Sequence, residues 1–178
     1  MKRILLIAAA AVSVIVIIVL GLALAQPDTF KLERDIAISA QPATIYANLD
    51  DFKRWALWSP WEKLEPNIKK TYTGPATGVG SIYEWEGKEV GSGRMTISDS
   101  KPSQQLTIKL EFIKPFEATN TTVFELTPQG KDTQVRWIMT GANNMFGKVM
   151  GVFADMDSMV GKDFESGLAA LKRVSESP

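Results

Sequence analysis

The sequence feature that most constrains the fold is a series of six segments, between residues 68 and 140, in which apolar and polar residues alternate. Alternation with a period of two is typical of strands that bury one face. The expected strands are 68–73, 81–86, 91–100, 104–113, 117–127 and 133–140. Short spacers rich in glycine and proline separate them, so consecutive strands are expected to pair antiparallel as hairpins.

Helical patterns flank this series on both sides. Residues 30–38 alternate and predict a first strand, 42–49 predict a short helix with Pro42 at an early position, and 50–58 predict a second short helix or turn. After the strands, 145–152 predict a short helix. From about 154 to 174 apolar residues recur every three or four positions, which predicts a long amphipathic helix. One sheet and one long helix that must bury their apolar faces favour an α+β fold in which a curved sheet grips the helix.

The beginning of the chain is a separate segment. Residues 4–25 form an uncharged run of 22 residues, and a helix of that length covers about 33 Å, enough for a bilayer core of about 30 Å. Two alternatives remain open: a transmembrane signal anchor, or a signal peptide cleaved after Ala25, where Ala23 and Ala25 give the small-x-small form of a cleavage site. Lys2 and Arg3 directly precede the run and predict a cytosolic N-terminus with the domain on the other side.

These patterns divide the chain into four parts. We expect the apolar segment 1–25, a short linker 26–29, one domain at 30–174 and a tail at 175–178. The linker reaches about 14 Å when fully extended. If the apolar segment is retained, the domain is therefore held close to the membrane.

Composition restricts the chemistry that this domain can perform. The chain has no cysteine and no histidine, which excludes disulfides, thiolate sites, histidine-dependent triads and the common zinc sites. The 20 basic and 20 acidic side chains cancel, so overall charge gives no reason to expect nucleic acid. We expect no catalytic residues, no metal and no cofactor, and the composition favours a binding domain.

Four stretches of the sequence resemble a known superfamily. They are residues 55–63 (WALWSPWEK), the pair 78–80 (GVG) and 83–85 (YEW), residues 91–97 (GSGRMTI) and residues 161–168 (GKDFESGL). With the order of elements, they resemble the START-like, helix-grip superfamily, also called SRPBCC, and within it the polyketide cyclase/dehydrase-type bacterial branch. The resemblance covers residues 30–174. It implies a helix-grip fold with a hydrophobic cavity between sheet and C-terminal helix, and a bacterial inner-membrane location for an anchored chain.

The alternation places large apolar side chains on the internal faces of the strands. With the aromatic residues of the short helices and the apolar residues of the long helix, they form the predicted lining of a ligand cavity: Trp55, Trp58, Tyr83, Trp85, Met95, Ile97, Leu106, Ile108, Leu110, Phe112, Trp137, Met139, Met156, Val160 and Phe164. Gly91 and Gly93 share an internal face and would leave space for a ligand. The alternative is an ordinary packed core, since bulky apolar faces usually pack together. Four methionines, Met145, Met150, Met156 and Met159, likewise fit either an adaptable surface on or near the long helix or a helix-spaced core.

Three functions follow from these observations. The first is a membrane-tethered protein that binds a hydrophobic small molecule or lipid without chemistry, with residues 4–25 in the membrane. The second is a cyclase or dehydratase similar to the enzymes that gave the family its name, for which the internal faces offer only Tyr46 and Tyr83 as polar groups. The third is a protein-interaction module with a filled core. A buried carboxylate near the cavity would favour the enzyme.

Overall fold

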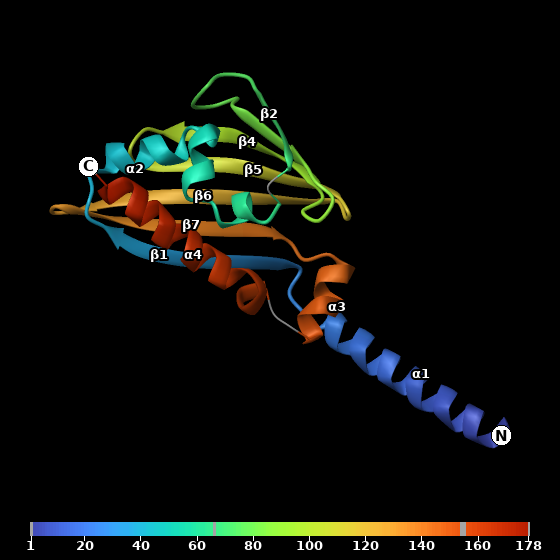
Figure 1. Cartoon of the computed structure of the whole chain (residues 1–178). Coiled ribbons are helices and arrows are strands. Elements are labelled where there is room, and N and C mark those ends of the chain that lie inside the picture. Colours follow the sequence, from blue (N-terminus) through green and yellow to red (C-terminus); the bar gives the residue numbers. More distant parts are fainter. Residues whose placement is uncertain (1, 66, 154–155, 178) are drawn as a thin grey trace.

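The computed structural model of the chain describes residues 2–65, 67–153 and 156–177, without the side chains of Leu5, Ala8, Met156, Ser158 and Met159. Its elements follow one another as α1 (Lys2–Leu24), β1 (Thr29–Ile38), α2 (Pro42–Leu49), the 3₁₀ helices η1 (Phe52–Leu57) and η2 (Pro60–Lys63), β2 (Lys69–Thr73), β3 (Ile82–Glu86), β4 (Ser92–Lys101), β5 (Gln105–Lys114), β6 (Ala118–Gln129), β7 (Asp132–Ala142), α3 (Met145–Phe153) and α4 (Met156–Glu176). Figure 1 shows this arrangement. The α+β class is confirmed.

All seven strands form one antiparallel sheet in the order β1-β7-β6-β5-β4-β3-β2. Strands β2 to β7 are a continuous meander of hairpins, as the alternation predicted, and β1 pairs with β7 at one edge. Strands β6 and β7 are longer than expected because their ladder continues to the pair Gln129 and Asp132. Only Gly130 and Lys131 connect them, and Gly130 has a φ of 66°, which glycine adopts without strain.

The chain crosses one face of the sheet between β1 and β2, because these two strands lie at opposite edges. The crossing segment contains α2, η1 and η2, and α4 contacts all three as well as β1. We call the face that these helices cover the inner face. Figure 1 shows α2 and α4 over the part of the sheet nearest the C-terminus, and no helix over the hairpin ends that point toward α3.

Arg34 fixes α4 against β1. Its guanidinium donates to both carboxylate oxygens of Asp157 at 2.7 and 2.8 Å and to Glu165 at 2.8 Å. A Cβ atom at Gly161 would lie 2.3 Å from the Arg34 guanidinium, so the helix can approach this side chain only with glycine there. The hydrogen bonds to Asp157 and Glu165 raise the pKa of Arg34 above its ordinary value.

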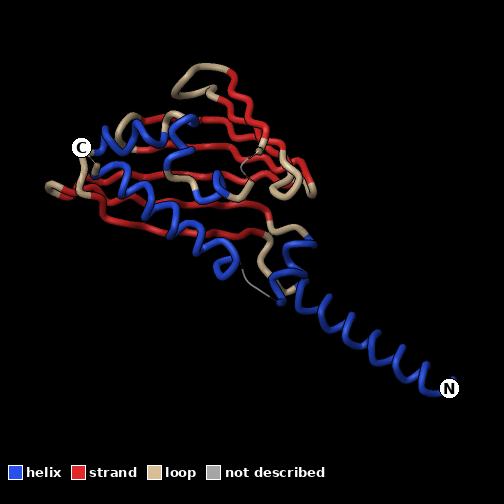
Figure 2. The backbone as a smooth tube through the Cα atoms, in the orientation of Figure 1, coloured by secondary structure: helices blue, strands red, loops and turns tan. Residues whose placement is uncertain are grey.

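Helix α1 extends away from the sheet, as the blue helix that follows the N-terminus in Figure 2 shows. It is long and apolar enough to cross a membrane. The linker that follows it is joined to the domain by hydrogen bonds: the backbone N–H of Asn143 donates to the Asp28 carbonyl at 2.8 Å, and the side-chain amide of Asn143 donates to the Pro27 carbonyl at 3.0 Å. The connection between α1 and β1 is therefore held in place by the segment that precedes α3.

Candidate functional site

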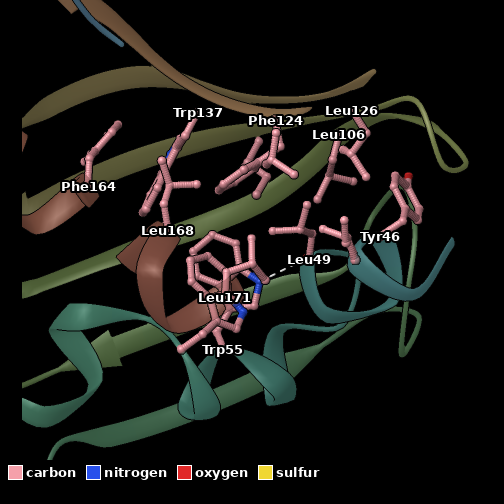
Figure 3. Packing of buried hydrophobic residues seen from close by; sticks show 14 of the residues in the cluster. Tyr46, Leu49, Trp55, Leu106, Phe124, Leu126, Trp137, Phe164, Leu168 and Leu171 are labelled. Atoms are coloured by element: carbon pink, nitrogen blue, oxygen red, sulfur yellow. Dashed lines mark hydrogen bonds between the residues drawn. The ribbon is translucent and has the colours of Figure 1, made fainter. Parts of the chain in front are cut away.

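Part of the inner face is filled by a cluster of aromatic rings under the helices. Phe164 of α4 stacks on Trp137 of β7 with ring centroids 4.0 Å apart, and Phe124 of β6 lies 4.9 Å from Trp137 on its other side. Trp58 and Trp61 meet the Trp137 ring edge-on, both at 5.7 Å. Figure 3 shows Phe164 and Leu168 of α4 beside Trp137, with Phe124 next along the sheet. We call this region the filled half of the inner face.

Two of the tryptophans in the predicted cavity lining cap the C-terminal end of a helix instead. Trp55 and Trp58 are both buried, and their indole N–H groups donate to the carbonyls of Leu49 at 2.9 Å and Asn48 at 3.0 Å. These carbonyls belong to the last turn of α2, where no further turn of helix can pair with them. The packing role of Trp55 and Trp58, which sequence analysis left as an alternative, is the one that the structure shows.

The other part of the inner face is open. Trp85, Met95, Leu110 and Phe112 are adjacent in the register of β3, β4 and β5. The first three are partly buried against the core, and 38% of Phe112 is exposed. No helix lies over the ends of these hairpins in Figure 1. We call these four residues the open half of the inner face.

Gly93 does not leave the empty space that sequence analysis assigned to it. A Cβ atom at this position would lie 2.3 Å from the Trp85 ring and 2.5 Å from the Glu111 carbonyl. Trp85 therefore lies flat across β4 and reaches Phe112, with ring centroids 6.0 Å apart in an edge-on arrangement. The glycine is needed for this aromatic platform and does not create a cavity.

Polar groups border the open half on two sides. On β6, Asn120 and Thr122 are buried on the inner face beside Leu110 and Ile108. Among the described residues, the Asn120 amide donates only to the Met139 sulfur, at 4.0 Å. The indole N–H of Trp137, which is buried in the filled half, has no acceptor in this part of the chain. The Asn120 amide and the Thr122 hydroxyl offer hydrogen bonds to a polar part of a ligand or to water.

A buried carboxylate lies on the other side of the open half, and sequence analysis missed it. The Glu62 side chain is only 7% exposed; it pairs with Lys70 of β2 and accepts a hydrogen bond from the Tyr83 hydroxyl at 2.9 Å. Burial and the Glu62 carboxylate raise the pKa of Tyr83 well above its ordinary value. Tyr83 is therefore ionised even less near neutral pH than an ordinary tyrosine, and so it is less available as a general base.

The remaining predicted lining residues are divided between core and boundary. Ile97, Leu106, Ile108, Met139 and Phe164 are buried in the core, and Val160 of α4 packs partly buried against it. The side chains of Met156 and Met159 lie outside the part of the chain that the structure describes. Of the predicted residues, those in the open half remain the candidates for direct contact with a ligand.

Two hollows in the surface lie away from these residues. One, of about 450 Å³, is at the β3–β4 turn and is lined by Glu65, Asn67, Glu86, Gly87 and Lys88. The other, of about 470 Å³, is at the ends of β1, β6 and β7 and is lined by Thr29, Phe30, Lys31, Thr119, Thr121, Thr140 and Gly141. Neither contains a residue of the predicted lining, so the open half is an apolar surface and is not part of either hollow.

Comparison with known proteins agrees with the fold. The family model described as polyketide cyclase / dehydrase and lipid transport matches residues 29–176. The chain belongs to this family. The match confirms the superfamily that the four sequence stretches resemble, and it extends from the start of β1 to the end of α4. No match was found among curated proteins.

Solved structures of other proteins share the architecture. A protein from Chromobacterium violaceum is 16% identical with a TM-score of 0.61, over 86% of this chain and 100% of that one. The Aha1 dimer from Colwellia psychrerythraea is 17% identical with a TM-score of 0.59, over 83% and 96%. A protein from Thermobifida fusca is 20% identical with a TM-score of 0.61, over 81% and 92%. At such identities the likeness concerns the fold alone.

Proposed function

We propose that this chain binds a hydrophobic small molecule or lipid on the open half of the inner face, without catalysis, while α1 anchors the domain to a membrane. The observation that carries the proposal is the exposure of one part of an otherwise buried apolar face. Trp85, Met95, Leu110 and Phe112 are neighbours over three strands, and none of the helices that the structure describes covers them. Covering such a surface with an apolar ligand gains about 25 cal/mol per Å² removed from water.

The polar groups at the border suit an amphipathic ligand. On β6, Asn120 pairs with Leu110 and Thr122 with Ile108, so both lie next to the open half on the same face of the sheet. They could bind the polar group of a ligand whose apolar chain lies on Trp85 and Phe112. A few fixed polar groups in a mostly apolar site are typical of sites for small molecules. The printed description of the family, which includes lipid transport, supports the same ligand class.

The packing of α1 favours retention of the N-terminal segment. Ala23, which belongs to the small-x-small sequence, is fully buried, and α1 stays helical to Leu24. A signal peptidase needs this sequence accessible and extended, so a helix packed at that point argues for an anchor. We propose a single pass through a bacterial inner membrane, with the N-terminus in the cytosol and the domain on the extracytoplasmic side.

A second function, that of a cyclase or dehydratase, is favoured by one observation. Glu62 is a buried carboxylate beside Tyr83, which is the arrangement that sequence analysis named as support for an enzyme. Its two oxygens are taken, however, by Lys70 and by Tyr83. A carboxylate whose two oxygens both have partners is not free to accept a proton from a substrate. We therefore favour ligand binding over catalysis as the function.

Photocrosslinking tests the proposed site. The full chain is placed in vesicles that contain a lipid with a diazirine on its acyl chain, and the labelled peptides are identified after irradiation. We expect adducts on β3, β4 and β5 in addition to those on α1, which serve as an internal control. Phe112→Ser should remove the strand adducts, whereas Lys109→Ser, on the outer face of the same strand, should keep them. Adducts confined to α1 would contradict the proposed site.

A further inference from the structure

Helix α3 is an apolar helix that the domain does not cover. None of its nine residues is buried, and 54% of Phe146 and 71% of Phe153 are exposed, with Met145 and Met150 also exposed. Of the two interpretations of Met145 and Met150 given by sequence analysis, the exposed one holds and the core one is wrong. Single exposed apolar residues are ordinary on a protein surface, but four on one short helix form a patch of the kind that marks an interaction site.

The other side of α3 packs against the end of α1. The two helices are in contact, and a Cβ atom at Gly151 would lie 3.9 Å from the Gln26 side chain. Lys148 pairs with Asp28 at 2.5 Å. Because these contacts hold α3 beside the last turns of α1, the exposed side of α3 has a fixed position relative to the apolar helix.

The exposed apolar surface continues from α3 onto the sheet. Phe116, in the β5–β6 turn, stacks on Phe146 with ring centroids 4.7 Å apart, and 59% of it is exposed. Ile113, near the end of β5, is also exposed. We call the following residues the α3 patch: Ile113, Phe116, Met145, Phe146, Met150 and Phe153.

We propose that the α3 patch lies in the interfacial layer of the same bilayer that α1 crosses. This inference rests on the proposed role of α1 as an anchor. A helix that lies in a membrane interface buries its apolar face about 5–10 Å into the boundary between headgroups and acyl chains. Helix α3 packs beside the last turns of α1. A span of this length leaves the hydrocarbon core at its last turns, so α3 would lie at the depth of the membrane interface. The patch is therefore continuous with the apolar surface of the anchor.

This arrangement identifies the source of the ligand as the bilayer itself. Phe112 of the open half pairs with Ala118 beside the β5–β6 turn that carries Phe116 of the α3 patch, so the open half ends at the part of the sheet that would contact lipid. An acyl chain could move from the membrane onto Trp85 and Phe112 without crossing water, which avoids exposing its apolar area. The ligand class that this path admits is a membrane-resident lipid or a similarly water-insoluble molecule.

Site-specific fluorescence tests the inference in the full chain. The chain has no cysteine, so a single cysteine can be labelled without removing any other. Labels at Phe153→Cys and, as a second site, Phe116→Cys are compared with Lys131→Cys, in the β6–β7 turn. The chain is reconstituted in phosphatidylethanolamine/phosphatidylglycerol vesicles containing a lipid with a nitroxide at a shallow acyl position. We expect the labels at 153 and 116 to lose most of their fluorescence and to be protected from aqueous iodide, and the label at 131 to show the reverse.

Three other results would overturn the inference, and they differ in what else they affect. Labels at 153 and 116 that behave like the label at 131 show that the patch faces water. Labels protected from iodide but not quenched by the lipid nitroxide show that a second copy or another protein covers the patch. A label at Ser13→Cys that a deep nitroxide does not quench shows that α1 is not inserted, which removes the proposed anchor as well. Either of the first two results, when the label at 13 is quenched, leaves the anchor and rejects only the membrane contact of the α3 patch.

Discussion

Two phenylalanines on the inner face allow the filled and open halves to be compared by the same truncation. Phe164 is fully buried, stacks on Trp137 at 4.0 Å and meets Trp61 edge-on at 6.1 Å. Phe164→Ala should lower the free energy of unfolding by about 4 kcal/mol, because it loses the transfer energy of the ring and leaves a cavity between α4 and β7. Phe112 is 38% exposed and has one aromatic neighbour, Trp85. Phe112→Ala should cost only about 1–2 kcal/mol, since less area is lost and water fills the space.

In ligand binding the order of the two variants should be reversed: Phe112→Ala, the more stable variant, should bind less ligand than Phe164→Ala. Urea denaturation followed by tryptophan fluorescence gives the stability of each variant, and the diazirine lipid gives the yield of strand adducts per folded molecule. We expect Phe112→Ala to lose most of the adducts and Phe164→Ala to keep them where it is folded. Equal stability losses would show that Phe112 is packed like a core residue. Unchanged adducts in Phe112→Ala would show that the ligand lies elsewhere, and either result refutes the division of the inner face.

Three further predictions concern other parts of the chain. The backbone N–H groups of residues 88–90 hold the pKa of Glu65 below its ordinary value, so the stabilisation of the β3–β4 turn by this carboxylate is present above the unfolded pKa and is lost as pH falls through the lowered one. The hydrogen-exchange protection factors of this turn, which are corrected for the intrinsic pH dependence of amide exchange, should therefore fall in acid, and Glu65→Gln should make them low already at neutral pH; protection factors that do not change with pH would show that the carboxylate does not order the turn. Glu62→Gln should lower stability by about 1–3 kcal/mol because Lys70 loses its partner, while lipid adducts stay unchanged; unchanged stability with loss of a chemical conversion would favour the enzyme. Intact mass of the protein extracted from membranes should include residues 1–25, and a shorter mature chain would exclude the anchor.

The meander could be predicted from sequence because its order depends on neighbouring segments. Each hairpin joins consecutive strands, so alternation and turn residues determine both the strands and their pairing. Leu106 and Ile108 were assigned to the inner face by alternation alone and are buried there. Asn120 and Thr122 alternate with Phe124 in the same way, and this signal could have placed them on the inner face as well.

The division of the inner face could not be predicted, because it depends on which helix covers which row of the sheet. Trp55 and Trp85 are the same residue type and were both predicted to line the cavity. In the structure Trp55 caps α2, whereas Trp85 lies across Gly93. Glu62 follows a tryptophan in a proline-containing turn and looks like a surface residue until η2 brings it to Tyr83. Local periodicity carries no information on such contacts, which join residues of different elements.

The most direct test of the central claim is native mass spectrometry of the full chain, excised from its own membranes in polymer-bounded nanodiscs. The account predicts that the wild type retains one apolar molecule after the surrounding lipid has been stripped. It also predicts that the folded variant Trp85→Ser/Phe112→Ser does not retain it. Because α1 is unchanged in this variant, lipid bound only to the anchor would survive in both proteins. The same bound molecule in both, or none in the wild type, would contradict the claim that the open half of the inner face is a binding site.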